Sequence, residues 1–172
     1  MNAQSNGTPA SLPDYVPVIV IGAGPTGMTA ATMLAQQGIS CLMLDRHETV
    51  YPLPRAVHAD DEIYRILTRV GVGDEFAAHR RPGLGLRLLD TDMRVLAELK
   101  RSPQPSANGY PQMNMFDQPE LEAMMRVNLK RYPDVALRGD VEVTGVTQDR
   151  PDRVRVSFLD RVRGGQHSVE AR

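Results

Sequence analysis

A glycine-rich segment between two apolar runs constrains the fold of this 172-residue chain more than any other feature. Residues 15–21 (YVPVIVI) form a β-branched run that ends at Gly22, the pattern of a strand buried on both faces in a parallel sheet. The pattern after this run predicts a helix over about 25–37 and a second buried strand over 40–44 that ends at Asp45. This strand, helix and strand order predicts a βαβ unit, and therefore an α/β fold with a parallel sheet.

Residues 22–27 (GAGPTG) match the G-x-G-x-x-G pattern between a strand and a helix, the context that a dinucleotide-binding loop requires. Gly22 permits the tight turn, Gly24 lets a pyrophosphate approach the backbone, and Gly27 lets the helix pack closely on the strand. The pyrophosphate would then bind free N–H groups at the positive end of the helix dipole. The alternative is a glycine-rich turn without a ligand.

Asp45 lies 18 residues after the third glycine, at the end of the second predicted strand. A carboxylate at this place accepts hydrogen bonds from ribose hydroxyls and disfavours a 2′-phosphate. The pattern therefore predicts FAD or NAD and argues against NADP at this site.

The rest of the chain alternates loops, two amphipathic helices and a β-rich end. Ile63, Ile66, Leu67 and Val70 follow helical spacing, as do Leu121, Met124, Met125 and Leu129 after the predicted cap at Asp117. We expect loops over 46–57 and 101–109, helices over about 59–71 and from Asp117, a strand pair within 84–99, and strands over 135–137, 141–146, 153–158 and 166–172. These last strands predict a β-meander.

Composition excludes several classes of protein. The 20 Lys and Arg residues balance 21 Asp and Glu residues, which gives no reason to expect a nucleic-acid partner or an anionic membrane. The single cysteine, Cys41, excludes a disulfide framework and a multi-cysteine zinc site. Residues 1–14 have no secretion-signal pattern and are expected to be a disordered tail, so a cytoplasmic protein is the default expectation.

Two segments carry a resemblance to known flavoproteins. The stretch 22–38 (GAGPTGMTAATMLAQQG) resembles FAD-binding oxidoreductases of the glutathione-reductase-like fold. Residues 55–63 (RAVHADDEI) resemble the segment after the second strand in class A flavoprotein monooxygenases, the single-component aromatic hydroxylases. The resemblance implies that Arg55 reaches the flavin diphosphate or ribityl region, and a guanidinium suits phosphate. The alternative is an exposed loop arginine.

A further segment, 115–122 (MFDQPELE), is similar to the Q-x-x-L/V-E/D element of the same family. That similarity implies that Gln118 contacts the flavin ribityl or phosphate groups. The alternative is helix capping by Asp117 and Glu120 with Gln118 solvated. Within the family, the sequence looks most like 3-(3-hydroxyphenyl)propionate hydroxylases and related phenol hydroxylases, over about residues 16–172.

The resemblance implies a Rossmann-like FAD-binding fold over 15–172, with a parallel sheet, a crossover β-meander and additional strands. It also implies that NAD(P)H reduces FAD, that O₂ adds as a C4a-hydroperoxide, and that oxygen passes to a phenolic or other aromatic substrate. The alternatives are an NAD-binding dehydrogenase domain and a catalytically incomplete FAD-binding fragment. Because such enzymes are longer than 172 residues, we expect the N-terminal portion of one, with the substrate domain largely absent.

The candidate cofactor-binding residues are Gly22, Gly24, Pro25, Thr26, Gly27, Asp45, Arg46, Arg55 and Gln118. No catalytic acid or base and no metal ligand is predicted. The acidic residues 60–62 suit a helix N-terminus, and the four histidines lack metal-ligand spacing. The sequence leaves a homo-oligomer open.

Overall fold

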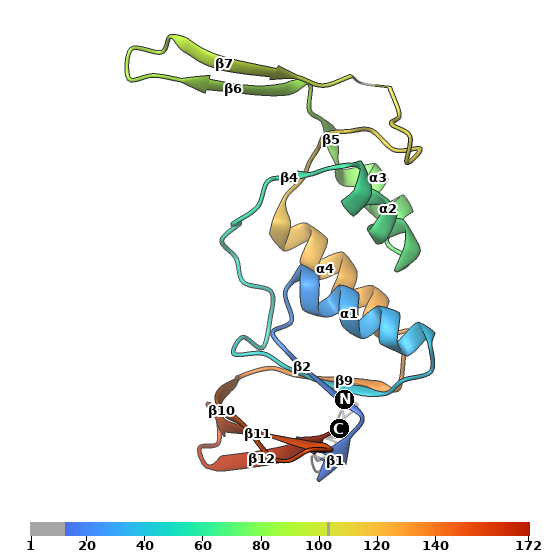
Figure 1. The fold of residues 1–172 in the computed structure, drawn as a ribbon, viewed down its shortest axis with the longest axis vertical. Helices are drawn as coiled ribbons and strands as arrows, with labels where there is room; N and C mark the ends of the chain where they lie inside the picture. The colour runs from blue at the N-terminus through green and yellow to red at the C-terminus, as the bar shows by residue number, and fades with distance from the viewer. Residues whose placement is uncertain (1–12, 103) are drawn as a thin grey trace, which may run out of the picture.

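A computed structural model describes residues 13–102 and 104–172, so nearly all of the expected disordered tail (1–14) lies outside the described residues. The chain extends along one axis, with four helices grouped near the middle. A β-meander lies at one end and a β-hairpin projects from the other (Figure 1).

The parallel sheet at the centre has the order β2-β3-β9, with β2 at Val18–Ile21, β3 at Cys41–Leu44 and β9 at Val135–Arg138. All four residues of β3 are buried, which confirms a strand enclosed on both faces. The run 15–21 does not form one strand, because Pro17 has no N–H to donate and divides it. Its first part, β1 (Tyr15–Val16), pairs with β12 in a different sheet.

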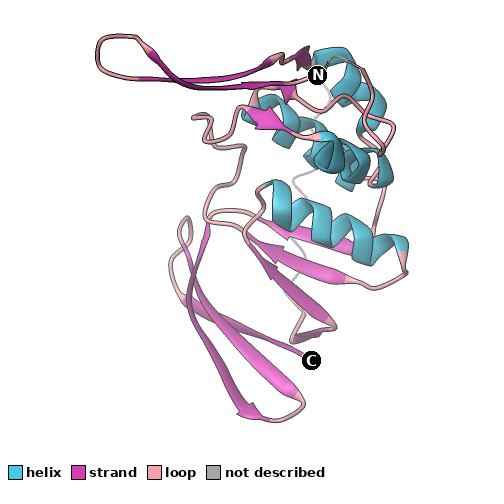
Figure 2. Cartoon of the chain, turned by 45° about the horizontal axis from the view of Figure 1, so that its top comes forward, coloured by secondary structure: helices cyan, strands magenta, loops and turns pink. Residues whose placement is uncertain are grey.

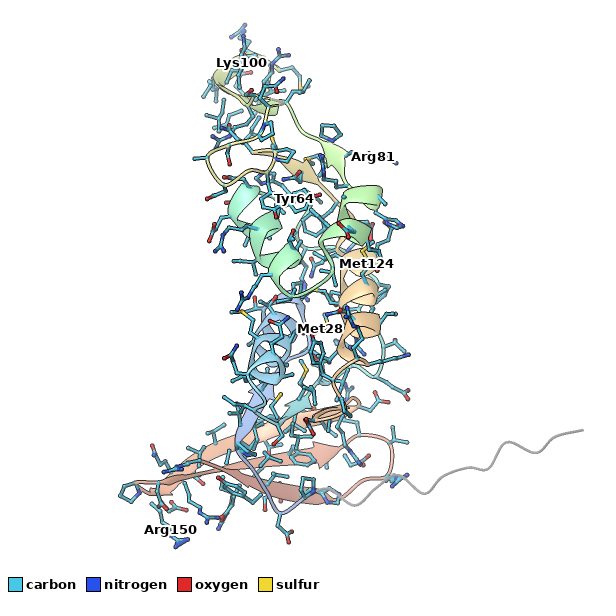
Figure 3. The ribbon with its side chains drawn as sticks, turned by 90° about the vertical axis from the view of Figure 1, so that its right-hand side faces the viewer. Met28, Tyr64, Arg81, Lys100, Met124 and Arg150 are labelled. Carbon is cyan, nitrogen blue, oxygen red and sulfur yellow. The ribbon has the colours of Figure 1, made fainter. Side chains whose placement is uncertain are left out.

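Two helices cover one face of this sheet. They are α1 (Pro25–Gln36) and α4 (Gln118–Leu129), which also pack against each other. Met28 of α1 and Met124 of α4 both lie in the middle layer of the molecule (Figure 3). Met28 of α1, Met43 of β3 and Met125 of α4 belong to one apolar cluster, so both helices turn a buried face to this core.

The meander covers the opposite face. It consists of β10 (Val141–Arg150), β11 (Arg153–Asp160) and β12 (Gln166–Ala171), paired antiparallel in chain order. Its Phe158 is fully buried and packs with Leu42 of β3 in a second apolar cluster. Alternate residues of β3 thus contribute to two cores, one on each side of the sheet.

A smaller layer lies beyond α4. It holds α2 (Asp61–Arg69), α3 (Gly73–His79) and a small sheet of β4 (His58–Ala59), β8 (Asn114–Met115) and β5 (Arg81–Pro82). The α2 helix begins after Asp60, whose Oδ1 accepts a hydrogen bond from the Ile63 N–H at 2.8 Å, as a helix cap does. The helical spacing placed Ile63 on the apolar face of this helix, but Ile63 is 44% exposed.

Tyr64 is buried in place of Ile63 in this layer. Its ring makes an edge contact with Phe76 of α3 at 5.1 Å between centroids. The α3 helix was not predicted from the sequence. Phe76 of this helix gives Tyr64 an aromatic partner, so Tyr64 rather than Ile63 lies on the buried face of α2.

The hairpin of β6 (Gly85–Leu89) and β7 (Val95–Lys100) confirms the predicted strand pair and stands away from the helices (Figures 1 and 2). Within residues 13–102 and 104–172, no helix has both the length and the apolar character needed to cross a bilayer.

Candidate nucleotide site

The glycine loop has the tight geometry that its sequence predicts. Gly22 has a φ of +100°, a conformation that favours glycine, and its N–H donates to the Leu44 carbonyl of β3 at 2.8 Å. A Cβ on Gly27 would overlap the Gly22 carbonyl oxygen and lie 3.3 Å from Cγ1 of Val20. The first turn of α1 therefore rests directly on the loop and on β2.

Gly24 faces open space. A Cβ at this position would meet no heavy atom of the described residues within 4 Å. The helix α1 begins immediately after Gly24 with Pro25, has no acidic residue in its first turn and has no side-chain cap. This helix end therefore presents its positive dipole end and backbone N–H groups with no carboxylate in its own first turn, which suits an anion.

Asp45 stands at the end of β3 with its carboxylate turned to the loop. Oδ2 accepts a hydrogen bond from the Ala23 N–H at 2.6 Å, and Oδ1 accepts one from the His47 N–H at 2.7 Å. Its own backbone is fixed on both sides, by Arg138 O at 2.9 Å and by the Val141 N–H at 3.0 Å. Each carboxylate oxygen has a second lone pair, which leaves acceptor capacity for a ligand hydroxyl.

A cleft of about 420 Å³ lies at this end of the sheet. Five of the residues predicted from the sequence line it: Gly22, Gly24, Asp45, Arg46 and Arg55. Pro25, Thr26 and Gly27 form the adjoining first turn of α1. Glu142, which was not among the predicted residues, also lines the cleft, so the structure brings two acidic residues, two arginines and the glycine loop to a single opening.

The two arginines of the cleft are held by different contacts. The Arg55 guanidinium lies over the Tyr51 ring, with Cζ 5.4 Å from the ring centroid. Arg46 Nε donates to Nε2 of His47 at 3.1 Å, and its carbonyl oxygen accepts from Arg161 of the meander at 3.0 Å. Both cations are exposed, so a phosphate in the cleft would not have to displace a buried ion pair.

Gln118 is placed differently from the other candidates, because it does not line the cleft. Only 6% of this residue is exposed, so the alternative in which it is solvated is wrong. Its Oε1 accepts from the N–H groups of Arg55 and Ala56, both at 2.8 Å, and its Nε2 donates to Glu122 at 2.7 Å. The expected cap is also present, since Oδ1 of Asp117 accepts from the Glu120 N–H at 3.2 Å.

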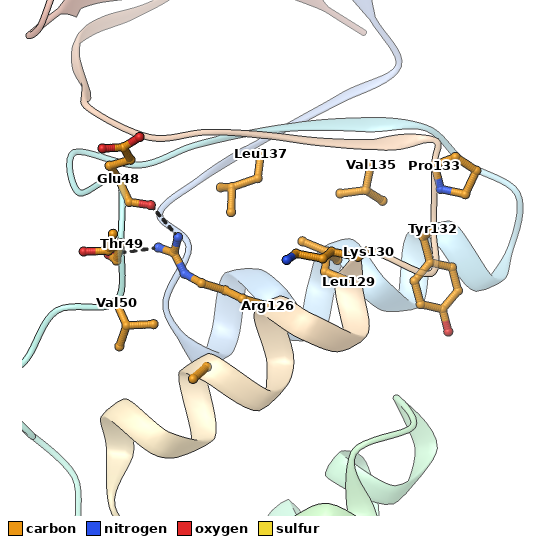
Figure 4. A pocket seen from close by; sticks show the side chains of 11 residues that line it. Glu48, Thr49, Val50, Arg126, Leu129, Lys130, Tyr132, Pro133, Val135 and Leu137 are labelled. Carbon is orange, nitrogen blue, oxygen red and sulfur yellow. Dashed lines mark hydrogen bonds between the residues drawn. The ribbon is translucent and has the colours of Figure 1, made fainter. Parts of the chain in front are cut away.

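A larger pocket, of about 630 Å³, lies elsewhere, between α4, β9 and residues 48–50 (Figure 4). Arg126 closes one side by donating to the carbonyl oxygens of Glu48 at 2.7 Å and Thr49 at 3.2 Å. None of the candidate cofactor residues lines this pocket. Among the residues that the structure describes, no three His, Cys, Asp or Glu side chains form a metal-ligand group.

The fold and the glycine loop define the class of dinucleotide-binding α/β domains. A family model for the FAD binding domain matches residues 15–172, and the chain belongs to that family. This confirms the resemblance found in the sequence.

Named hydroxylases are among the relatives. A 3-(3-hydroxy-phenyl)propionate/3-hydroxycinnamic acid hydroxylase of Mycolicibacterium vanbaalenii is 37% identical over 81% of this chain and 23% of its own length. The hydroxylase of the same name from Paraburkholderia xenovorans is 32% identical over 90% of the chain and 24% of its own length. The chain therefore spans about a quarter of the length of these relatives.

Solved structures share the fold. The p-nitrophenol 4-monooxygenase of Pseudomonas putida matches with a TM-score of 0.79 at 23% identity, over 92% of this chain and 40% of that one. A ternary complex of aklavinone-11 hydroxylase with FAD and aklavinone matches with a TM-score of 0.73 at 23% identity, over 93% and 32%. These likenesses confirm the Rossmann-like FAD-binding fold predicted from the sequence.

Proposed function

We propose that residues 15–172 form the FAD-binding domain of a flavin-dependent aromatic hydroxylase. The cleft beside Asp45 would hold the adenosine diphosphate part of FAD, with the diphosphate at the N-terminus of α1 and the ribose at the carboxylate. The observation that supports this most directly is the convergence of Gly22, Gly24, Asp45, Arg46 and Arg55 on one cleft.

The chemistry of the cleft fits this group. A diphosphate needs positive potential and open backbone N–H groups, which the uncapped α1 terminus, Arg46 and Arg55 offer together. The space next to Gly24, which a Cβ would fill, lets the ligand approach the main chain. A ribose needs an acceptor for its hydroxyls, and Asp45 supplies one at a fixed position.

Bound FAD would accept a hydride from NAD(P)H and use O₂ to hydroxylate the ring, so that one oxygen atom enters the substrate and the other leaves as water. The residues described above would bind and orient the cofactor; we assign no acid or base to them. Two relatives are named for 3-(3-hydroxyphenyl)propionate and 3-hydroxycinnamic acid, which supports a phenolic acid as the substrate of the whole enzyme.

Titration of the purified chain with FAD tests cofactor binding, with flavin fluorescence as the signal and NAD⁺ as the comparison ligand. We expect saturable binding of FAD and no competition by equimolar NAD⁺. Binding of NAD⁺ without binding of FAD would favour a dehydrogenase domain instead. Oxidation of NAD(P)H that increases on addition of 3-(3-hydroxyphenyl)propionate would show turnover by the chain itself. FAD binding without that increase would identify a cofactor-binding fragment.

A further inference from the structure

A buried polar pair on α4 lies outside the cleft and is not needed to cap the helix. Glu122 follows Gln118 by one turn, so both side chains project from the same face of the helix. Only 4% of Glu122 and 6% of Gln118 are exposed. Burial of a carboxylate and an amide in an apolar layer is unfavourable unless each makes hydrogen bonds, so the pair needs a structural reason.

The two ends of the Gln118 amide explain the pair. Oε1 accepts from two consecutive backbone N–H groups, those of Arg55 and Ala56, and so uses both of its lone pairs. The reversed amide would place its own N–H₂ group against these two donors. Glu122 prevents this, because its carboxylate accepts from Nε2 at 2.7 Å and can only accept hydrogen bonds when ionised. Glu122 therefore fixes the direction in which Gln118 points.

The segment held in this way carries an arginine of the cleft. Residues 53–57 are exposed, and Gln118 ties them to a helix more than 60 residues further along the chain. With its backbone N–H fixed, Arg55 lines the cleft that Asp45 and Gly24 also line, and its guanidinium lies over the Tyr51 ring.

We propose that Gln118 and Glu122 act as a clamp on the loop at Arg55 and Ala56, and that the clamp positions the Arg55 guanidinium for the diphosphate of FAD. Gln118 is then a positioning residue that acts through the loop backbone, and Glu122 orients it. The positioning of Arg55 for a diphosphate rests on the proposed function, the binding of FAD.

An exchange of the two side-chain types tests the clamp. Gln118→Glu keeps an acceptor for both N–H groups but places a second carboxyl group against Glu122. The two groups can share a proton at low pH and repel each other once both are ionised, so the clamp opens as the pH rises. In Gln118→Glu combined with Glu122→Gln the donor and acceptor are interchanged, and the hydrogen bonds can form again. Glu120→Gln is the control for the Glu122→Gln part of the exchange, because it removes the same charge from an exposed position on the same helix.

Two readouts are measured for each variant. Hydrogen exchange at the Arg55 and Ala56 amides, without FAD, reports the clamp itself, and flavin fluorescence gives the Kd for FAD. We expect Gln118→Glu to lose amide protection and to bind FAD about tenfold or more weakly, as the loss of a charge-assisted hydrogen bond implies. The exchanged double variant should recover both properties, and the control should change neither.

Three results would overturn the proposal. The exchanged double variant could remain as weak as Gln118→Glu; the two amides could stay protected while FAD affinity falls, which would make Gln118 a direct ligand; or protection could be lost with no change in Kd. If Gln118→Glu does not fold, Gln118→Leu with Glu122→Leu replaces the pair by apolar side chains of similar size. This variant should fold and still lose both amide protection and FAD affinity. If the unaltered chain binds no FAD, the proposed function fails, whereas the exchange data without FAD still decide whether the clamp exists.

Discussion

Asp45→Ala gives the sharpest test of the proposed cleft, because the carboxylate has one structural role and one proposed ligand role. The substitution removes the acceptor of two short hydrogen bonds, from Ala23 at 2.6 Å and from His47 at 2.7 Å. Hydrogen bonds to a charged group contribute about 1.5–3 kcal/mol each, and water at the cleft can partly replace them. We therefore expect the free energy of unfolding to fall by about 2–3 kcal/mol. Loss of the ribose hydrogen bonds should weaken FAD binding by a further ~1–3 kcal/mol, or about 5–150-fold in Kd.

Urea unfolding without FAD measures the first effect of Asp45→Ala, and flavin fluorescence titration under conditions where the variant remains folded measures the second. Glu142→Gln is the matched control, because Glu142 lines the same cleft and loses the same charge. This control should leave the Kd within about threefold of the unaltered chain, since removal of a negative charge does not weaken the binding of an anion. An unchanged Kd in Asp45→Ala, with the expected loss of stability, would refute the assignment of Asp45 to the ribose.

Three further substitutions probe the loop and the meander. Gly27→Ala should lower the urea midpoint by the equivalent of about 1–3 kcal/mol, because the new Cβ overlaps the Gly22 carbonyl, and an unchanged midpoint would contradict this packing. Gly24→Ala should leave the midpoint unchanged and weaken FAD binding, since its Cβ enters open space where the diphosphate is proposed to bind; unaltered affinity would place the diphosphate elsewhere. Hydrogen bonds from the following backbone turn and from Arg138 lower the pKa of Asp160 to about 2, so its stabilisation is complete above the unfolded pKa of 3.8 and is lost as the pH falls toward 2. The difference in free energy of unfolding between the unaltered chain and Asp160→Asn should therefore shrink from about pH 5 to about pH 2 in urea titrations, a range that spans the folded and unfolded pKa values of Asp160. A constant difference would exclude this role.

The parts of the fold that sequence predicts well are those determined over short distances along the chain. The glycine loop, the cap at Asp117 and the buried strand at 41–44 each depend on neighbouring residues, and each is found where it was expected. The two-residue period predicted for β11 likewise appears as alternating buried and less buried positions over the second half of that strand.

Sequence patterns failed where distant segments decide the outcome. The run 15–21 looks like one strand, yet its first two residues pair with β12 of the meander. Pro17 separates them from the rest of the run. Ile63 fits the helical stripe, but the aromatic contacts of Tyr64 with Phe76 and with Tyr110 determine which face of α2 is buried. No local signal marks these contacts, because their partners lie on α3 and on the loop before β8.

The walls of the cleft show why a motif alone cannot define such a site. The glycine loop supplies one wall, but the segment that follows Asp45 is held by the meander, through Arg161 and the Arg46 carbonyl, 115 residues apart. A Cβ on Gly139 would overlap the backbone of Glu48, so this junction also depends on close packing. Arg55 is held from the other side by Gln118 of α4. Because cation placement depends on backbone anchors so far along the chain, the meander and α4 are parts of the proposed cofactor site although neither carries the glycine motif.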